Sequence, residues 1–471
     1  MNTSSPSATN LSLTQQLVEL QKRPVDALTR QRALLHWLDW MGCVAAGSGA
    51  PAAQRLRDWQ LFPVAQQATT HPEVKPFKGL LGAAETPMQA LMAEAGAANV
   101  EEMDDMHRTA ILHPGPVILP AVACLARQGS FTAGQLLDAI VRGYETMIRI
   151  GRAVGSHHYF YWHNTATAGA FGAASACADL LALSDEARAW ALGNAGTQAA
   201  GLWQVRLEPV MSKQLHTGHA AWAGVTASSL AAAGFTGPLR ILEGERGFFA
   251  AMCPDGVPER VCAPESDWLI HETSFKPWPA CRHTHATIDA TLALRETLGE
   301  QAFAFQHARV ESFDDALSIC DRAAPSTRTE AKFSLQYAVA AAARFGDLEP
   351  HHFDEVCWSD PELRHAASRV ELQPNAALQS AYPAHYGAKV TLTFADGQSF
   401  SHTVHDSLGD PERALSGDQV LEKMVRLMAY GGVASSQVDA LLASARRLLD
   451  DEAGSLMDQP LPDVFTQPLL S

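Results

Sequence analysis

A run of small residues between Thr165 and Leu183 restricts the fold of this chain more than any other stretch. Alanine recurs every four residues and two glycines lie between, at Ala166, Ala170, Ala174, Ala178, Gly169 and Gly172. Small side chains at helical spacing allow neighbouring helix backbones to approach closely. The run therefore predicts a buried helix.

Helical spacing of apolar residues extends over most of the first half of the chain. Further helices are expected over residues 11–46, 86–98, 130–153, 185–200 and 215–233. Ser130 is a suitable cap for the third of these helices, and Gly47 is a suitable stop for the first. The first half is therefore predicted to be all α.

Strand signals begin after a linker that contains Pro254, Gly256 and Pro258. Alternating, β-prone segments follow, and Asp396–Gly397 is a turn signal for a hairpin. The expected strands are 308–313, 369–372, 389–394 and 399–404, and the expected helices are 285–298, 330–344, 415–430 and 435–450.

These segments predict a mainly α fold with an inserted, smaller α+β domain. The helical domain is expected to comprise residues 11–262 and 410–455, because the last helices pack most economically on the first domain. Residues 263–409 form the α+β lid domain. The polar residues 1–10 are expected to be disordered, and residues 456–471 form a C-terminal tail.

Composition excludes several classes of function. A net charge of −16 argues against nucleic-acid binding, which needs a basic surface. The eight cysteines are scattered without a C-x-x-C pair, which is typical of reduced thiols in a cytoplasmic enzyme. No secretory signal is visible, and the longest apolar run, 220–233, is too short to span a membrane.

Residues 102–116 gather groups that suit a reactive pocket better than a core. Three carboxylates, two imidazoles and one guanidinium occur there: Glu102, Asp104, Asp105, His107, His113 and Arg108. Adjacent carboxylates raise one another's pKa, and nearby imidazoles can share the proton. The alternative interpretation is a solvated acidic turn before a Pro-Gly loop.

Two further clusters open predicted helices. His163 directly precedes the small-residue helix, where the helix dipole favours a neutral ring or a bound anion; His157 and His158 are expected to be structural. Lys213 and His216 open a later helix, where a lysine is unfavourable unless an anion is bound. The alternative for Lys213 is a solvated surface lysine.

A fourth cluster, residues 275–285, is a loop stiffened by two prolines. Lys276 and Arg282 in this loop are suited to hold a carboxylate, or else simply contact water. Cys281 is a candidate nucleophile, but no Cys/His/Asn spacing supports that role, which favours an inert thiol.

Known metal and nucleotide motifs are absent from the sequence. It contains no H-E-x-x-H, facial-triad spacing or clustered cysteines, and no G-x-G-x-x-G after a strand or Walker A motif. We therefore expect no metal and no other cofactor.

The combination of motifs resembles the MmgE/PrpD family from about Leu34 to Ala443. Five motifs stand in family order: Asp104-Asp105 with His113-Pro114-Gly115, His163, Lys213-Gln214-Leu215-His216-Thr217-Gly218, Phe275-Lys276-Pro277-Trp278-Pro279-Ala280-Cys281-Arg282, and Ala331-Lys332-Phe333-Ser334-Leu335-Gln336-Tyr337. The resemblance implies a helical domain with an inserted lid, usually a homodimer. It also implies action on a small di- or tricarboxylate substrate without metal or organic cofactor.

The resemblance further implies a site between the domains. The catalytic candidates are Asp104, His113, His163, Lys213 and Tyr337, and the substrate-binding candidates are Glu102, Asp105, His107, Arg108, His216, Lys276, Cys281 and Arg282. His163 and Asp104 are the base and acid candidates, with His113 as their partner. Lys213, Lys276 and Arg282 would hold carboxylates, and Lys213 is an alternative proton donor.

One motif departs from the family pattern. The acidic motif commonly reads Asp-Phe-Asp-Asp-Thr, whereas this chain has Glu102-Met103-Asp104-Asp105-Met106 followed by His107-Arg108. The first acid is longer and the threonine hydroxyl is lost. The change is compatible with a more anionic or differently shaped ligand.

The first expectation is a cofactor-free lyase of the 2-methylcitrate dehydratase type, which abstracts a proton next to a carboxylate. The alternatives are an isomerase of the iminodisuccinate epimerase type, an enzyme of the cis-aconitate decarboxylase type, and a carboxylate-binding protein without activity.

Overall fold

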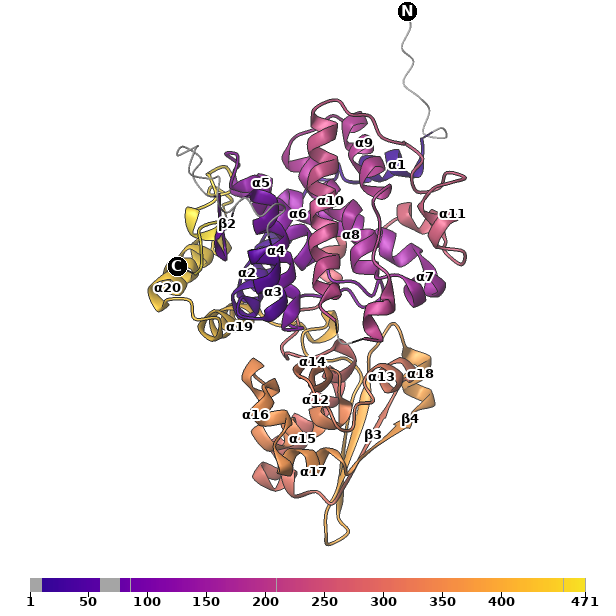
Figure 1. The fold of residues 1–471 in the computed structure, drawn as a ribbon, viewed down its shortest axis with the longest axis vertical. Helices are drawn as coiled ribbons and strands as arrows, with labels where there is room; N and C mark the ends of the chain where they lie inside the picture. Colours follow the sequence, from indigo (N-terminus) through magenta and orange to yellow (C-terminus); the bar gives the residue numbers. More distant parts are fainter. Residues whose placement is uncertain (1–10, 60–76, 85, 209, 452, 471) are drawn as a thin grey trace, which may run out of the picture. The chain divides into compact units, whose positions relative to one another are not determined.

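The computed structural model describes residues 11–59, 77–84, 86–208, 210–451 and 453–470 (Figure 1). The predicted disorder of residues 1–10 lies outside the described residues. The chain divides into two compact units. Unit 1 comprises the chain up to Val100, Asp104–Thr273 and the chain from Gly417 onward, and unit 2 comprises Glu101–Met103 and Ser274–Ser416. The sequence prediction had placed the divisions at 262/263 and 409/410.

The described residues of unit 1 form helices and one small hairpin. Its α-helices are α1 (Leu13–Leu20), α2 (Ala27–Gly47), α3 (Pro51–Asp58), α4 (Pro87–Val100), α5 (Gly115–Ala126), α6 (Ala133–Ala153), α7 (Gly155–Tyr161), α8 (Asn164–Leu180), α9 (Asp185–Gly196), α10 (Ser212–Ala232), α11 (Phe248–Met252), α19 (Gly417–Tyr430) and α20 (Ser435–Leu449). Its strands β1 (Phe77–Gly79) and β2 (Gly82–Ala84) pair antiparallel, and its 3-10 helices are η3 (Trp203–Arg206), η4 (Pro258–Cys262), η5 (Leu269–Glu272) and η10 (Asp463–Phe465).

The small-residue run forms the buried helix α8, as predicted. Every residue of α8 except Asp179 is buried, and the helix packs against α6 and α10 (Figure 1). A Cβ on Gly172 would lie 2.7 Å from the Cβ of Met147 on α6, and one on Gly224 of α10 would lie 2.4 Å from that of Ala173. Such close packing admits only glycine at these two positions.

Unit 2 combines a mixed sheet with helices. Its strands β3 (His307–Ser312), β4 (Val370–Pro374), β5 (Ala388–Thr393) and β6 (Ser399–Val404) lie in the order β4-β3-β5-β6. Its α-helices are α12 (His285–Leu298), α13 (Asp314–Ile319), α14 (Arg328–Lys332), α15 (Leu335–Phe345), α16 (Glu355–Trp358), α17 (Pro361–Ala367) and α18 (Ala376–Ala381), and its 3-10 helices are η6 (Arg282–Thr284), η7 (Gly299–Ala304), η8 (Pro350–Phe353) and η9 (Pro411–Arg413). Helix α12 packs against β5, β6 and α15.

The sheet confirms the predicted hairpin and shows one parallel pairing. Strands β5 and β6 pair antiparallel with Thr393 opposite Ser399, so the turn includes Asp396–Gly397. Strand β3 runs parallel to β4 and antiparallel to β5. The predicted mainly α fold with a smaller α+β part is therefore correct.

Several expected helix boundaries differ from the structure, of which three have a clear local cause. The predicted helix 11–46 is two helices, because the chain leaves helical geometry around Pro24, and Asp26 then caps α2. The helix expected from Ser130 begins after Thr132, whose side chain accepts from Gln135 N–H. The helix expected over 330–344 is divided, and Ser334 caps its second part.

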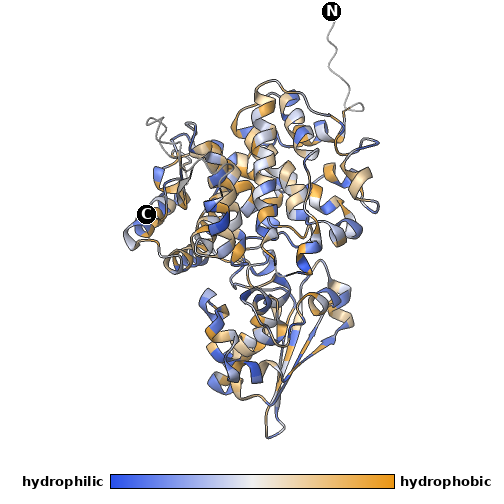
Figure 2. Cartoon of the chain, viewed as in Figure 1, coloured by the Kyte–Doolittle hydropathy of each residue, from blue (hydrophilic) through white to orange (hydrophobic). Residues whose placement is uncertain are grey.

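Most of the described helices carry hydrophilic as well as hydrophobic residues (Figure 2), whereas α5 contains no polar or charged side chain. Among the described residues, no helix has both the length and the apolarity that crossing a membrane requires.

Candidate active site

Asp104 and His113 form an acid–imidazole pair in unit 1. His113 Nδ1 lies 2.9 Å from Asp104 Oδ2 and 3.1 Å from the main-chain oxygen of Asp105. We assign the ring proton to Nδ1 because both of these neighbours are acceptors, which leaves Nε2 as the nitrogen that can exchange protons. Asn99 Nδ2 also donates to Asp104 Oδ2, at 2.8 Å, and so fixes the carboxylate.

Asp105 has a different environment from its neighbour. Its carboxylate accepts from the Tyr144 hydroxyl at 2.6 Å and from the Gly115 N–H at 2.7 Å, and it lies 2.7 Å from His36 Nδ1. Burial lowers the pKa of His36 to about 4, so the ring is neutral near pH 7 and donates from Nδ1. These contacts tie Asp105 to α2, α5 and α6, and its substrate-binding role stays a prediction.

His163 stands at the N-terminus of α8, as its place in the sequence predicted. Its side chain does not cap the helix. Instead, its Nδ1 lies 3.2 Å from His216 Nδ1, and its ring lies over Trp203 with 4.2 Å between ring centres. The close approach of two imidazole nitrogens requires one to donate and the other to accept, so the two rings share at least one proton.

The surroundings of His163 are positively charged. Burial lowers the pKa of His163 well below its usual value, and the charges of His216, Lys213 and His113 lower it further. Burial likewise lowers the pKa of His216 to about 4. Lys213 lies in the first turn of α10, where the helix dipole adds positive potential. A neutral base in such surroundings suits a site for an anion.

Two hydrogen bonds bring the acid–imidazole pair to the same helix end. The His113 N–H donates to Thr165 Oγ1 at 3.1 Å, and Asn164 Nδ2 donates to the Ala110 oxygen at 2.9 Å. The loop that carries His113 is therefore fixed on the first turn of α8, next to His163. The structure thus brings together five of the predicted residues in unit 1: Asp104, His113, His163, Lys213 and His216.

His107 and Arg108 are buried at a tight turn in unit 1. The main chains of His107 and Leu112 exchange hydrogen bonds of 2.9 and 3.3 Å, and Ala110 N–H donates to His107 Nδ1 at 3.2 Å. Burial lowers the pKa of His107 to about 4, which makes this ring a neutral acceptor. His107 therefore stabilises the turn, and the substrate-binding role of both residues stays a prediction.

In unit 2, Lys276 and Lys332 hold the segment 101–103. Lys276 is fully buried, and its Nζ donates to the Glu102 main-chain oxygen at 3.2 Å and to Oε2 at 3.3 Å. Lys332 Nζ contacts Glu101 Oε2 at 2.5 Å, and Arg328 Nη2 contacts the same oxygen at 2.8 Å. Glu102 has a φ of 56°, a left-handed conformation that is uncommon outside glycine.

Arg282 and Tyr337 each have a protein partner in unit 2. Arg282 forms a buried ion pair with Asp410, and its Nη1 lies 3.1 Å from His285 Nδ1. The Tyr337 hydroxyl donates to the His352 main-chain oxygen at 2.5 Å, and burial raises the pKa of the phenol. Their predicted roles toward a substrate stay predictions.

Cys281 is buried beside a second thiol of unit 2. A hydrogen bond from the Cys320 side chain is the main cause that lowers the pKa of Cys281, and burial opposes it. The eight cysteines of the chain are free thiols. Cys281 therefore has more thiolate character than an ordinary buried cysteine.

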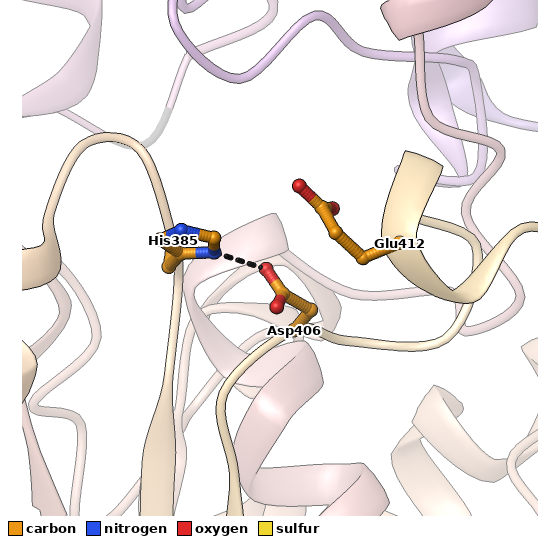
Figure 3. Close-up of side chains that lie close together, drawn as sticks. All are labelled: His385, Asp406 and Glu412. Carbon is orange, nitrogen blue, oxygen red and sulfur yellow. Dashed lines mark hydrogen bonds and ion pairs between the residues drawn. The ribbon is translucent and has the colours of Figure 1, made fainter.

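One group of side chains in unit 2 has the composition of a metal site. Ligand atoms of His385, Asp406 and Glu412 lie within 4.8 Å of one another. Figure 3 shows the Asp406 carboxylate turned toward the His385 ring, and Asp406 Oδ1 lies 2.7 Å from His385 Nδ1. This ion pair accounts for the proximity of the two residues without an ion.

Sequence reasoning missed several side chains that support the site. His36 on α2 and Tyr144 on α6 both bond Asp105, although neither was among the predicted site residues. Glu102 was predicted as a site residue, but its neighbour Glu101 was not. A buried polar residue on an apolar helix face was the available signal, because such residues need a partner.

The structure has the two features that the family resemblance implies. It has a helical unit with an acid–imidazole cluster at a buried helix end, and an α+β segment lies within the sequence of that unit. The chain matches the MmgE/PrpD N-terminal domain over residues 12–260 and the MmgE/PrpD C-terminal domain over residues 278–448. The chain belongs to the MmgE/PrpD family, which confirms the resemblance drawn from its motifs.

Its relatives include cis-aconitate decarboxylases. The chain is 27% identical to the cis-aconitate decarboxylase of Homo sapiens over 389 residues, which cover 79% of this chain and 78% of the relative. It is 26% identical to that of Aspergillus terreus (strain NIH 2624 / FGSC A1156), with 91% and 90% covered, and 26% identical to that of Mus musculus, with 80% and 78% covered.

Proposed function

We propose that the chain is a lyase acting on a small tricarboxylic acid, with decarboxylation of cis-aconitate as its first candidate reaction. The observation that carries the proposal is the imidazole cluster at the start of α8, where buried His163 lies 3.2 Å from His216 Nδ1 and the charge of Lys213 acts on its ring. The names of the relatives support decarboxylation over dehydration as the first reaction to test.

The proposed reaction breaks a carbon–carbon bond and places a proton on carbon. The carboxylate that leaves becomes carbon dioxide, and its bonding electrons pass into the allylic system of the remaining acid. A protein acid then protonates the carbon, which gives itaconate. These reaction steps require positive groups that stabilise the developing negative charge. They also require one well-placed proton donor.

The unit 1 cluster contains both requirements. Lys213 offers positive charge to a substrate carboxylate, and the neutral His216 ring can donate a hydrogen bond to one. His113 is positioned to exchange a proton through Nε2, because Asp104 holds the ring from the Nδ1 side at 2.9 Å. His163 and Lys213 are the alternative donors.

The same cluster supports a second candidate, dehydration of 2-methylcitrate. In that reaction a base removes a proton next to a carboxylate, and a hydroxyl group leaves as water after it has gained a proton. The lowered pKa of His163 keeps this ring in the basic form near pH 7, which suits it to the first step.

Proton NMR in deuterated water distinguishes these reactions. The enzyme is incubated separately with cis-aconitate, 2-methylcitrate, citrate and iminodisuccinate. Itaconate carrying deuterium from cis-aconitate supports the decarboxylase, and a vinyl product from 2-methylcitrate supports the dehydratase. Deuterium exchange on iminodisuccinate alone would instead assign an epimerase. Silence with every acid contradicts the proposal.

The Lys213→Ala variant connects any activity to this cluster. We expect it to remain folded, because Lys213 is half-buried at a helix start, and to lose turnover. Near-normal turnover would remove Lys213 from the mechanism. Asp418→Asn is a suitable control, because that carboxylate is exposed on α19 and pairs loosely with Arg446 at 3.8 Å.

Two coarser features belong to the same proposal. We expect a homodimer, as the family resemblance implies, and a cytoplasmic location, which eight free thiols favour. Sedimentation velocity tests the first and fractionation of the source cells tests the second.

A further inference from the structure

Arg206 adjoins the imidazole cluster but belongs to none of the motifs that identify the family. It ends η3, and its guanidinium carbon lies 5.1 Å from the ring centre of Trp203 and 5.7 Å from that of Tyr159. Trp203 in turn contacts His163, with 4.2 Å between ring centres and an angle of 32° between the ring planes. One tryptophan therefore contacts both the guanidinium and the candidate base.

The backbone fixes this arrangement. The His163 N–H donates to the Gly201 oxygen at 2.9 Å, and Trp162 forms an antiparallel bridge with Leu202. Gly201 has a φ of 123°, and a Cβ there would lie 2.7 Å from the Cβ of Ala166. Glycine is thus required at this position, and η3 starts in a fixed place on the first turn of α8.

Arg206 differs from the arginines that support the fold. Arg149 is buried and pairs with Glu145 at 2.8 Å, whereas Arg206 is exposed and forms no ion pair with any carboxylate in the described part of the chain. Aromatic rings contact its guanidinium, which is planar and keeps its N–H groups available at its edge. Such a group suits bidentate binding of a carboxylate.

The charge of Arg206 also reaches the base. Burial is the main cause that lowers the pKa of His163, and the positive charge of Arg206 acts in the same direction as those of the neighbouring imidazoles and Lys213. The guanidinium of Arg206 is therefore close enough to His163 for its charge to act on that ring.

We infer that Arg206 binds the distal carboxylate of the substrate and thereby selects acids with three carboxylates over acids with two. The inference rests on the proposed function for the class of ligand. Lys213 and the imidazoles lie at the helix ends, and Arg206 contacts the same tryptophan as His163. A third, more distant carboxylate is therefore the group that Arg206 is placed to meet.

Direct binding of unreactive acids tests the inference. Propane-1,2,3-tricarboxylate and propane-1,2-dicarboxylate differ by one terminal carboxylate, and calorimetric titration at constant ionic strength gives the affinity of each. For Arg206→Gln we expect about tenfold weaker binding of the tricarboxylate and a change within about twofold for the dicarboxylate, because one exposed charge-assisted contact is lost. Arg206→Lys should retain part of the preference, since it keeps the charge without the planar fork.

Arg240→Gln is the matched control. Arg240 is also exposed and arginine-to-glutamine removes the same charge, but its partner is Glu243 at 3.3 Å. We expect both affinities to remain those of the parent. Equal weakening of both acids by Arg206→Gln would indicate a general effect of charge and would overturn the inference, as would unchanged binding or a parent that does not bind the tricarboxylate.

The binding and NMR experiments separate the two hypotheses. If Arg206→Gln removes the preference while no acid reacts, the binding inference is supported and the proposed reaction fails. If cis-aconitate reacts but Arg206→Gln keeps the parent's preference, the reaction is supported and the inference is wrong.

Discussion

His113 Nδ1 lies 2.9 Å from Asp104 Oδ2, so this carboxylate keeps the ring proton on Nδ1 and fixes the orientation of the ring. Asp104→Asn removes the negative charge and keeps the shape of the side chain. An amide in place of the carboxylate no longer fixes the tautomer of the His113 ring, and we expect turnover to fall about 10²- to 10⁴-fold with the fold intact. Steady-state kinetics with the reacting acid and circular dichroism measure the two effects.

The double variant with His113→Gln shows whether the pair acts as a unit. Removing both partners should cost no more turnover than the worse single change, because groups that act together are non-additive. If the losses multiply instead, Asp104 and His113 act independently and their contact is not part of the mechanism.

Lys276 and Glu102 form a buried ion pair within unit 2, with 3.3 Å between Nζ and Oε2. Lys276→Met leaves the carboxylate buried without its cation, and we expect it to lower the free energy of unfolding by about 3 kcal/mol. Adding Glu102→Gln should restore most of that loss. Urea unfolding of the four proteins of the double-mutant cycle gives the coupling energy.

Turnover of the same four proteins shows whether Lys276 only stabilises the Glu102 carboxylate or also binds the substrate. If Lys276 binds a substrate carboxylate, the double variant regains stability and stays inactive. A double variant that regains both would show that Lys276 acts only through Glu102.

His158 makes stability depend on pH. Its ring is buried between the Met252 oxygen at 3.1 Å and Thr167 Oγ1 at 2.9 Å, and burial lowers its pKa from 6.5 to about 4. Below pH 6.5 the unfolded chain takes up a proton that the folded chain does not, so stability present above pH 6.5 is lost as the pH falls toward 4. This one imidazole contributes a slope of at most about 1.4 kcal/mol per pH unit.

His158→Gln should reduce that slope, because the amide does not titrate and can meet both hydrogen-bond partners. Urea unfolding at pH 7.0, 6.0 and 5.0 measures it for the parent and the variant. His157→Gln is the matched control on the exposed side of α7, and its slope should equal that of the parent. An unchanged slope in His158→Gln would mean that this ring is protonated in the folded state too.

The fold was predictable where periodicity decides it. Alanine and glycine spacing predicted α8, and Asp396–Gly397 predicted the β5–β6 hairpin, because both signals are local. The division of the first predicted helix was missed since Pro24 was given less weight than the apolar spacing on either side.

The candidate site was predictable only as a set of motifs. Sequence placed His163 at a helix start, but its contact with Trp203 and the proximity of Arg206 depend on how residues 201–206 pack on α8. The partners of Asp105 come from helices far apart in the chain, and no local signal joins His36 to Tyr144. Such long-range contacts follow from tertiary packing alone.

The Gly115→Ala variant tests whether the position of the Asp105 carboxylate affects the function of the adjacent Asp104. The Gly115 N–H donates to Asp105 Oδ1 at 2.7 Å, and a Cβ at Gly115 would lie 2.7 Å from that same oxygen. Because Tyr144 also holds the carboxylate, Gly115→Ala forces the loop to move. We expect the free energy of unfolding to fall by about 2 kcal/mol and turnover to decrease with it.

Gly49→Ala is the matched control, since a Cβ there would meet nothing within 4 Å. It should change the free energy of unfolding by less than about 0.5 kcal/mol and leave turnover unchanged. Thermal unfolding and kinetics of both variants decide the question. Full activity in a destabilised Gly115→Ala protein would show that Asp105 supports the fold without positioning Asp104. Loss of turnover beyond the loss of folded protein would show that the Asp105 anchor sets the geometry of the acid–imidazole pair.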